Sequence, residues 1–472
     1  MMLLERFFNF SGNHTDFRTE LLAGITTFAS MVYIITVNPG ILSGFAVNTP
    51  LWNGIFVATC LSAALGTLAA GLLSNKPLAL APGMGINTYF ALVAVSVSAM
   101  LGISYLESYQ ACLSIIILEG ALFLLLTLLH IREKIVDTIP ECIRVAIAPA
   151  IGLFIMKIAL TSNVTLFSEK GGPFYMGSDF FGAITVGYAA EGMGSAFPKM
   201  YLSVASMLTG FFAMAALYCR RVTGSIPLGM AAAAGVYWIG APFIGETPFK
   251  ALETASWVPP VSDFLDTTFF RFDFATFFRI GWDSALILII TFCLVDLFDT
   301  VGTLIGTSSK TNLLREKHNM NRAMLSDALA TVGGGLAGTS TVTTFAETNS
   351  GIAAGGRTGL TAIVVAVLFL LCSFLSPLAV LIPAPATSAV LLFVGILMFA
   401  ELKKINFSDM QDFAPAMVMI AAMPVFGSVG HAIGLGIISF AAIRLCLGKW
   451  REVSWMIYGA GILFIIKFFF TF

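Results

Sequence analysis

Long apolar runs recur throughout the chain, and they constrain the fold more than any other feature. Runs such as 51–73 and 106–130 have the length of about 20 residues that a helix needs to cross a bilayer. Charged residues make up 11% of the chain, whereas soluble domains carry about 25%. Long unbroken runs are also unlike the short alternating segments of membrane β-barrels. The sequence therefore predicts an all-α polytopic membrane protein.

The apolar runs indicate about fourteen spans, and a polar connection at 245–279 separates the first seven from the rest. A further apolar run, 454–471, is expected to be either an interfacial helix or an additional span. The expected spans lie near 18–37, 51–73, 78–102, 106–130, 136–160, 200–218, 224–244, 280–304, 324–337, 340–354, 358–380, 386–402, 411–427 and 429–447.

Basic residues predict the orientation in the membrane. Lysines and arginines in short loops mark the cytoplasmic side, and here they follow the even-numbered spans, which puts the N-terminus in the cytoplasm of a cell-membrane protein. The net charge of −1 gives no reason to expect a nucleic-acid partner. The residues are Lys76, Arg132, Lys134, Arg220, Arg221, Lys310, Arg315, Lys317, Arg322, Lys403, Lys404, Lys449 and Arg451.

Two spans are poor candidates for simple helices. One begins PLALAPGMGINTYF (77–90) and the other reads STVTTFAETNSGIAAGG (340–356), so both place Gly, Thr and Asn in the middle of a hydrophobic region. Non-helical backbone at membrane depth is tolerated only where it is buried in protein or lines a cavity. Interrupted spans at corresponding places of two halves point to the binding site of a transporter. We therefore expect spans 3 and 10 to be broken helices.

The two halves of the chain echo one another at other positions. Pro140 is followed twelve residues later by Gly152, and Pro383 is followed twelve residues later by Gly395. Each repeat would hold seven spans, and an odd number forces the second copy to be inverted. The sequence thus predicts a 7+7 inverted-repeat transporter in which the broken spans enter from opposite sides and meet near the midplane.

Acidic residues inside the predicted spans are the candidate binding groups. Asp296 and Asp299, in LVDLFDTVGTL, share one helix face, while Glu347 and Asn87 lie in the two broken spans. Intramembrane acids are costly and are functional by default. Carboxylates accept N–H bonds and the amide both donates and accepts, so a flat ligand with N–H donors, such as a nucleobase, fits this set.

Backbone near Gly85 and Ala346 is expected to fix the plane of the ligand, and Thr27 is a candidate lining residue or a helix-packing hydroxyl. An acid that alternates between protonated and charged forms can couple a proton to the ligand, and Asp296 or Asp299 is expected to do so. The alternative for each acid is that it bonds backbone or hydroxyl groups and fixes helix packing.

Other polar and aromatic residues are weaker candidates. Glu119 is intramembrane, and it either pairs with a neighbouring helix or touches ligand. Tyr89 could stack on a planar base, but aromatic core packing is commoner. The seven cysteines form no CxxC pair, so we interpret them as small core residues and expect no metal site and no cofactor.

Four stretches carry a resemblance to a known family. They are GITTFASMVYIITVNP (24–39), ALAPGMGINTYF (79–90), LVDLFDTVGTLIG (294–306) and GTSTVTTFAETNSGIAAGGRTGLTA (338–362). They resemble the nucleobase–cation symporter 2 (xanthine/uracil permease) superfamily, specifically its adenine/guanine/hypoxanthine permease (AzgA-like) branch.

The resemblance implies a core domain of spans 1–4 and 8–11, here 1–130 and 280–380. It implies a gate domain of spans 5–7 and 12–14, here 131–250 and 381–472. It also implies purine uptake by proton symport, elevator-like movement of core against gate, and a possible homodimer through the gate domain.

The branch's binding residues correspond to Asn87, Asp296 and Glu347, with Asp299 implicated less directly. The uracil and xanthine branches place Glu where this chain has Asp296, and FAETNSG departs from many relatives. These departures bear on base preference and not on the fold.

Two rivals stay open at this point. An anion carrier of the same fold would need a positive site, and this one is acidic. A membrane-embedded enzyme would need a metal cluster or a nucleophile with a base, and the sequence offers neither.

Overall fold

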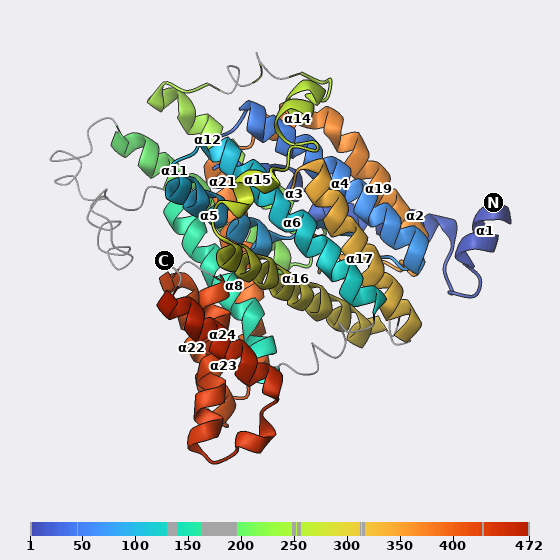
Figure 1. Ribbon diagram of the computed structural model, residues 1–472. Coiled ribbons are helices and arrows are strands. Elements are labelled where there is room, and N and C mark those ends of the chain that lie inside the picture. Colours follow the sequence, from blue (N-terminus) through green and yellow to red (C-terminus); the bar gives the residue numbers. More distant parts are fainter. Residues whose placement is uncertain are drawn as a thin grey trace.

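The computed structural model is a bundle of long helices with two three-residue strands (Figure 1). It describes residues 2–44, 46–129, 140–162, 196–247, 252, 256–311, 313, 317–426 and 429–470. Arg132, Lys134, Arg315 and the domain boundaries expected at 131 and 250 lie outside the described residues.

The first half of the chain follows the predicted order of spans. Span 1 is bent, and span 3 is a strand followed by a helix. The elements are α1 (Met2–Phe8), α2 (Phe17–Met31), α3 (Ile34–Leu42), α4 (Pro50–Ser74), β1 (Leu80–Pro82), α5 (Met84–Leu101), α6 (Tyr105–Leu128), α8 (Glu141–Ser162), α11 (Ala196–Cys219) and α12 (Ser225–Gly240).

The second half repeats this order after the connection. Span 10 is again a strand followed by a helix. The elements are α16 (Trp282–Thr311), α17 (Lys317–Ala337), β2 (Val342–Thr344), α18 (Thr348–Ala353), α19 (Gly359–Cys372), α20 (Ser376–Val380), α21 (Ala384–Phe399), α22 (Met410–Phe426), α23 (Val429–Cys446) and α24 (Trp455–Phe470).

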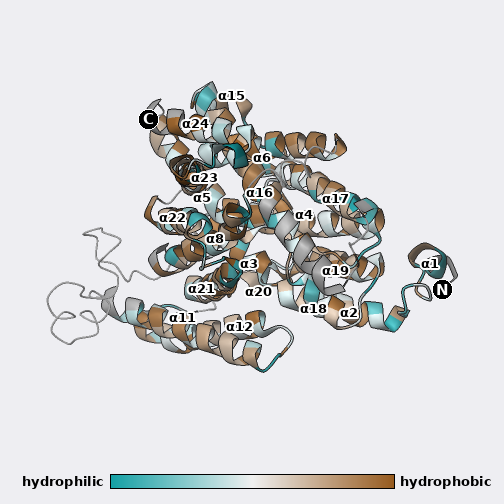
Figure 2. Ribbon diagram, turned by 90° about the horizontal axis from the view of Figure 1, so that it is seen from below, coloured by the Kyte–Doolittle hydropathy of each residue, from teal (hydrophilic) through white to brown (hydrophobic). Residues whose placement is uncertain are grey.

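Apolar residues cover the outside of the helices as well as the interior. Within the described residues, nine helices are long and apolar enough to cross a membrane, and α22 and α23 are apolar but shorter. Side chains such as Phe212 and Leu371 are 63% and 55% exposed, a surface expected to face lipid. Figure 2 shows hydrophobic residues along most helices, with hydrophilic colour gathered at ends and connections.

The two broken spans pair with each other, which confirms that spans 3 and 10 are interrupted and meet. β1 and β2 form an antiparallel pair in which Ala81 faces Thr343. The Gly83 N–H donates to the Thr341 carbonyl at 3.0 Å and the Phe345 N–H donates to the Ala79 carbonyl at 2.9 Å. These bonds satisfy backbone groups that have no water to bind at this depth. Each strand then leads into the N-terminus of a helix.

The echoing glycines lie against each other. A Cβ added at Gly152 would come within 2.6 Å of the Gly395 carbonyl, and one added at Gly395 would come within 2.7 Å of the Gly152 carbonyl. Gly152 also faces Met398, while Gly395 faces Met156. Reciprocal contacts of this kind are the mark of a two-fold relationship. The 7+7 inverted-repeat prediction is thus confirmed, and α8 and α21 pack closely along the repeat axis.

The polar connection and some boundaries differ from expectation. Residues 245–279 include two short helices, α14 (Val261–Thr267) and α15 (Phe274–Phe278), which pack on α4 and α6. α17 begins at Lys317 and not near 324, because helix continues into charged sequence outside the apolar run. Cys219 and Cys446 are exposed, so the core interpretation is wrong for these two.

The helices pack in two groups, which lie side by side in both views (Figures 1 and 2). In one group α4 contacts α17 and α19, and α6 contacts α17. In the other, α8 contacts α21 and α22, and α11 contacts α12 and α21. The paired strands belong to the first group, since β1 contacts α4 and β2 contacts α17.

Candidate functional site

A row of hydroxyl side chains runs into strand β2, and each one bonds an acid or an amide from a different helix. The serine and threonines of STVTT thereby connect spans 3, 4, 8 and 9. The pairs are Ser340 with Asn87, Thr341 with Glu119 at 2.9 Å, Thr343 with Asp299 at 3.4 Å, and Thr344 with Asp327 at 3.3 Å.

Asn87 bridges the two broken spans from the first turn of α5. Its Oδ1 accepts from the Ser340 hydroxyl, and its Nδ2 donates to the Pro82 carbonyl at 3.4 Å. The residue is fully buried. These two bonds hold the Asn87 side chain in place. The amide nitrogen carries a second hydrogen, which remains available to donate to a ligand.

Asp299 lies between the two broken spans, as expected. Its Oδ2 accepts from Thr343 of β2, and a Cβ added at Gly83, the residue before α5, would lie 3.4 Å from the same oxygen. The carboxyl group therefore sits where the strands turn into helices. A ligand at the helix N-termini would meet it.

Asp296 is one turn earlier on α16 and fully buried. The Thr300 hydroxyl lies 3.4 Å from Asp296 Oδ1 and 2.7 Å from Asp327 Oδ2. A hydroxyl has one hydrogen to donate, and the shorter contact, to Asp327, is the better one. Thr300 therefore donates to Asp327, and its hydroxyl oxygen lies between the two carboxyl groups.

Asp327 is a functional candidate that the sequence reasoning missed. It is fully buried on α17, and its Oδ1 accepts from the backbone N–H of Thr344 at 3.0 Å. It fell inside a predicted span, so the rule that marked Asp296 as costly in a membrane applied to it equally.

Glu347 lies at the other end of β2, just before α18. Its Oε1 accepts from the Tyr33 hydroxyl at 2.6 Å. Tyr33 sits in the bend of span 1, where the Thr36 N–H donates to the Tyr33 carbonyl in a tighter, three-residue turn. α16 contacts both β2 and α18, so span 8 packs against both parts of the broken span 10.

The remaining predicted lining residues fall at packing contacts. A Cβ at Gly85 would come within 2.6 Å of Ile151 on α8, so Gly85 faces the neighbouring group of helices. The Thr27 hydroxyl donates to the Ala23 carbonyl of its own helix at 3.1 Å. The exposed Ala346 has its carbonyl bonded by Asn349 at 2.9 Å.

Two further candidates have structural partners. Tyr89 stacks at a tilt on Phe292 of α16, with ring centroids 4.7 Å apart, as core packing predicts. The Arg357 guanidinium donates to the carbonyls of Ile352 and Gly356 at the end of α18. Among the residues that the structure describes, no group of acids, histidines and cysteines could hold a metal ion.

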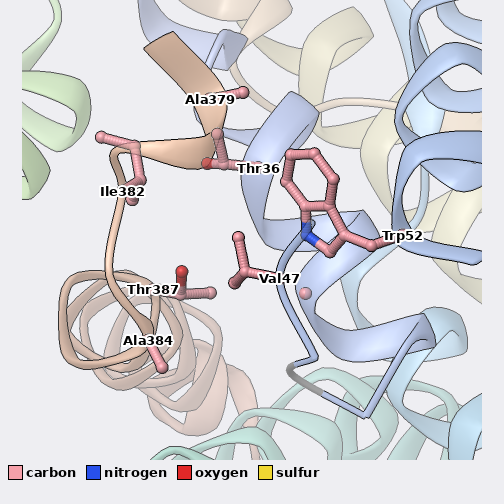
Figure 3. Close-up of a pocket in the computed structure, with 8 residues that line it drawn as sticks. Thr36, Val47, Trp52, Ala379, Ile382, Ala384 and Thr387 are labelled. Atoms are coloured by element: carbon pink, nitrogen blue, oxygen red, sulfur yellow. The ribbon is translucent and has the colours of Figure 1, made fainter. Parts of the chain in front are cut away.

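A small cavity lies between the two groups of helices, beside α3. Trp52, Thr36 and Val47 line it from spans 1 and 2, and Ile382 and Thr387 line it from the start of α21 (Figure 3). Thr36 is one helical turn from Tyr33, so the cavity borders the bend of span 1 and does not include the acids.

Inverted repeats, two broken spans paired at their strands and acids around them define a polytopic membrane transporter. The chain belongs to the permease family, whose sequence profile matches residues 18–433.

Its relatives extend over nearly the full length of both proteins. It is 36% identical to the putative permease MJ0326 of Methanocaldococcus jannaschii, with 99% of this chain and 98% of the relative covered. It is 34% identical to the adenine permease AdeP of Escherichia coli, with 98% and 96% covered. It is also 34% identical to the guanine/hypoxanthine permease PbuO of Bacillus subtilis, with 98% and 99% covered.

Solved structures share the fold at low identity. The transmembrane domain of the cyanobacterial bicarbonate transporter BicA aligns with a TM-score of 0.64 and 17% identity, covering 89% of this chain and 97% of that one. SLC26A9 aligns with a TM-score of 0.59 and 12% identity, covering 91% and 65%.

Proposed function

We propose that this permease imports purine nucleobases (adenine, guanine or hypoxanthine) by proton symport across the cell membrane. The observation that carries the proposal is the meeting of Asn87, Asp299 and the hydroxyls of β2 where two broken spans turn into helices. Relatives at 34% identity are named adenine permease and guanine/hypoxanthine permease, which supports the choice of base.

The chemistry of the site suits a flat base better than an anion. Asp296 and Asp327 are buried in or beside it and Asp299 is half-buried there, and carboxylates accept the N–H groups that a purine presents. Arg357 is engaged with carbonyls at the far end of α18. An anion would face repulsion from several acids, so the likeness to anion transporters supports the fold and not the substrate.

We propose that Glu347 and Asp296 accept N–H bonds from the purine and that Asn87 reads its edge. Backbone near Gly85 and Ala346 fixes the plane of the base, and Asp296 or Asp299 carries the transported proton. Buried acids that lie close together favour the uptake of a proton by one of them.

We also propose that a core domain, 1–130 and 280–380, moves as an elevator against a gate domain, 131–250 and 381–472. The packing of the helices in two groups supports this division. One contact between the two groups of helices is the hydrogen bond from the Thr36 hydroxyl to the Met230 sulfur at 3.6 Å. Bonds to sulfur are weak and easily exchanged. The gate domain then forms a homodimer, and the N-terminus lies in the cytoplasm.

Uptake of labelled adenine, guanine and hypoxanthine by cells that express the chain tests the substrate, with sulfate as the control anion. We expect saturable accumulation of unchanged base that a protonophore collapses. Sulfate uptake would reject the purine as the substrate. Accumulation that depends on sodium and survives the protonophore would reject the proton as the coupling ion.

Cross-linking tests the elevator movement. Gly85→Cys with Ile151→Cys places two thiols at a contact between the groups, where a Cβ at Gly85 already meets Ile151. Oxidation of the double variant should stop uptake and a reductant should restore it, whereas neither single variant should respond. Full uptake by the cross-linked protein would rule out sliding at this contact.

A further inference from the structure

Two fully buried glutamates in the core helices differ sharply in their hydrogen bonding. Glu20 of α2 accepts from the N–H groups of Arg357, Thr358 and Thr361 and from the Thr361 hydroxyl at 2.6 Å. Glu119 of α6 accepts at Oε2 from the Thr341 hydroxyl at 2.9 Å. Its Oε1 is buried without a hydrogen-bond partner among the described residues.

These surroundings suit different protonation states. Four donors satisfy a charged carboxylate at Glu20, whereas a buried charge with one hydroxyl partner is costly. A protonated Glu119 removes that cost. The hydroxyl of Thr341 can donate to a carboxylate or accept from a carboxylic acid, so the same pair bonds in both states. The Glu119–Thr341 pair can therefore stay bonded whether or not Glu119 carries a proton.

Acidic residues lie on two of the helices that pack against α6. α6 packs against α5, α15, α16 and α17, and α5 and α15 carry no acidic or basic residue. On α17, Asp327 bonds Thr344, three residues after the Thr341 that bonds Glu119, and α16 carries Asp296 and Asp299. A nearby like charge disfavours a second one.

Thr341 connects this carboxyl group to the base site. Its carbonyl accepts from the N–H of Gly83, the residue that precedes α5. The preceding residue, Ser340, bonds Asn87. Ser340 and Thr341 thus hold both the start of α5 and the Asn87 side chain. A change in the direction of the Thr341 hydroxyl would therefore be felt by the segment that positions them.

We propose that Glu119 is a second proton-binding site of the transport cycle, outside the base site and linked to it through Thr341. The inference rests on the proposed proton symport of purines. Glu119 takes up a proton when the base-loaded core is formed and releases it after the base leaves.

Purified protein in weakly buffered detergent solution provides the test. Hypoxanthine, adenine and guanine are added in turn, and proton uptake is measured together with the dissociation constant across pH 5 to 8. Linkage to one proton changes the dissociation constant by up to about tenfold per pH unit. For Glu119→Gln, a mimic of the neutral acid, we expect tight binding whose pH dependence is reduced and fewer protons taken up per base.

In proteoliposomes, Glu119→Gln should keep base exchange while accumulation driven by a pH gradient falls at least about tenfold. Glu107→Gln, on the same helix but exposed, is the matched control and should match the wild type. An unchanged proton count and pH profile in Glu119→Gln would overturn the inference, since the carboxyl would then be structural.

Thr341→Val gives an independent test that does not alter the acid. It removes the hydroxyl with little change of shape, and we expect it to shift the pH midpoint of base binding by at least about one unit. If the pH midpoint of base binding in Thr341→Val equals that of the wild type, the proposed coupling of Glu119 to the base site is wrong. This result stands even if Glu119→Gln cannot be purified. Wild-type protein that binds no purine, or binds it without protons, would instead refute the proposed function itself.

Discussion

Tyr33→Phe is the most direct test of how the candidate site positions Glu347. The Tyr33 ring is 1% exposed, and its hydroxyl donates to Glu347 Oε1 at 2.6 Å. The substitution removes one oxygen and adds no atom, so the packing of the ring is kept. A hydrogen bond to a charged group contributes about 1.5–3 kcal/mol, which corresponds to roughly 10- to 100-fold in affinity.

If Glu347 contacts the base, this loss should appear as a higher KM for purine uptake. Tyr105→Phe is the matched control, because its hydroxyl donates to the Leu42 carbonyl at 2.7 Å, away from the acids. Uptake should be measured over a range of base concentrations at equal amounts of protein in the membrane. A KM for Tyr33→Phe within about twofold of wild type, or an equal rise in Tyr105→Phe, would refute the reasoning.

Substitutions at three further positions probe the site and the contact between the two repeats. Glu347→Gln should abolish purine uptake and leave membrane insertion intact, and normal transport would remove Glu347 from the site. Asp327→Ala should lose more uptake than Asp327→Asn, which keeps an oxygen acceptor for the strand; equal losses would speak against that bond. Gly152→Val places Cβ 2.6 Å from the Gly395 carbonyl and should destabilise the solubilised protein by about 1–3 kcal/mol. Its control, Gly235→Ala, enters open space and should leave the thermal unfolding temperature unchanged or higher.

The fold was predictable because the bilayer leaves few choices. Helices are the spanning structure for long apolar runs, and the interruptions at 77–90 and 340–356 could only be buried breaks. The echo of Gly152 by Gly395 indicated a repeat, the odd number of spans in each copy indicated inversion, and the structure puts the two glycines in contact. Helix ends were less predictable, since apolarity marks the membrane and not the helix. α17 accordingly begins in charged sequence.

The candidate site was predictable where a polar residue stands out against apolar sequence, as Asp299 and Asn87 do. Tyr33 could not be found in this way, because a tyrosine in an apolar run is ordinary and its role depends on the bend of span 1. Asp327 carried the same signal as Asp296 and was overlooked. The hydroxyls of STVTT indicated only that the helix of span 10 is broken. Their partners could not be predicted, because the register of β1 on β2 decides which acid each hydroxyl contacts.

That register has a mechanical consequence for transport. Because β2 and the residues before it bond groups on α5, α6, α16 and α17, a shift of one acid relative to the strand would break several bonds in a dry interior. Such bonds are costly to leave unmade. Between the two groups of helices, the three atoms nearest to a Cβ added at Gly85 all belong to the apolar side chain of Ile151, which forms no hydrogen bond. We therefore propose that the acids, the strands and a bound base move together in the transport cycle, and that a proton enters or leaves without separating them.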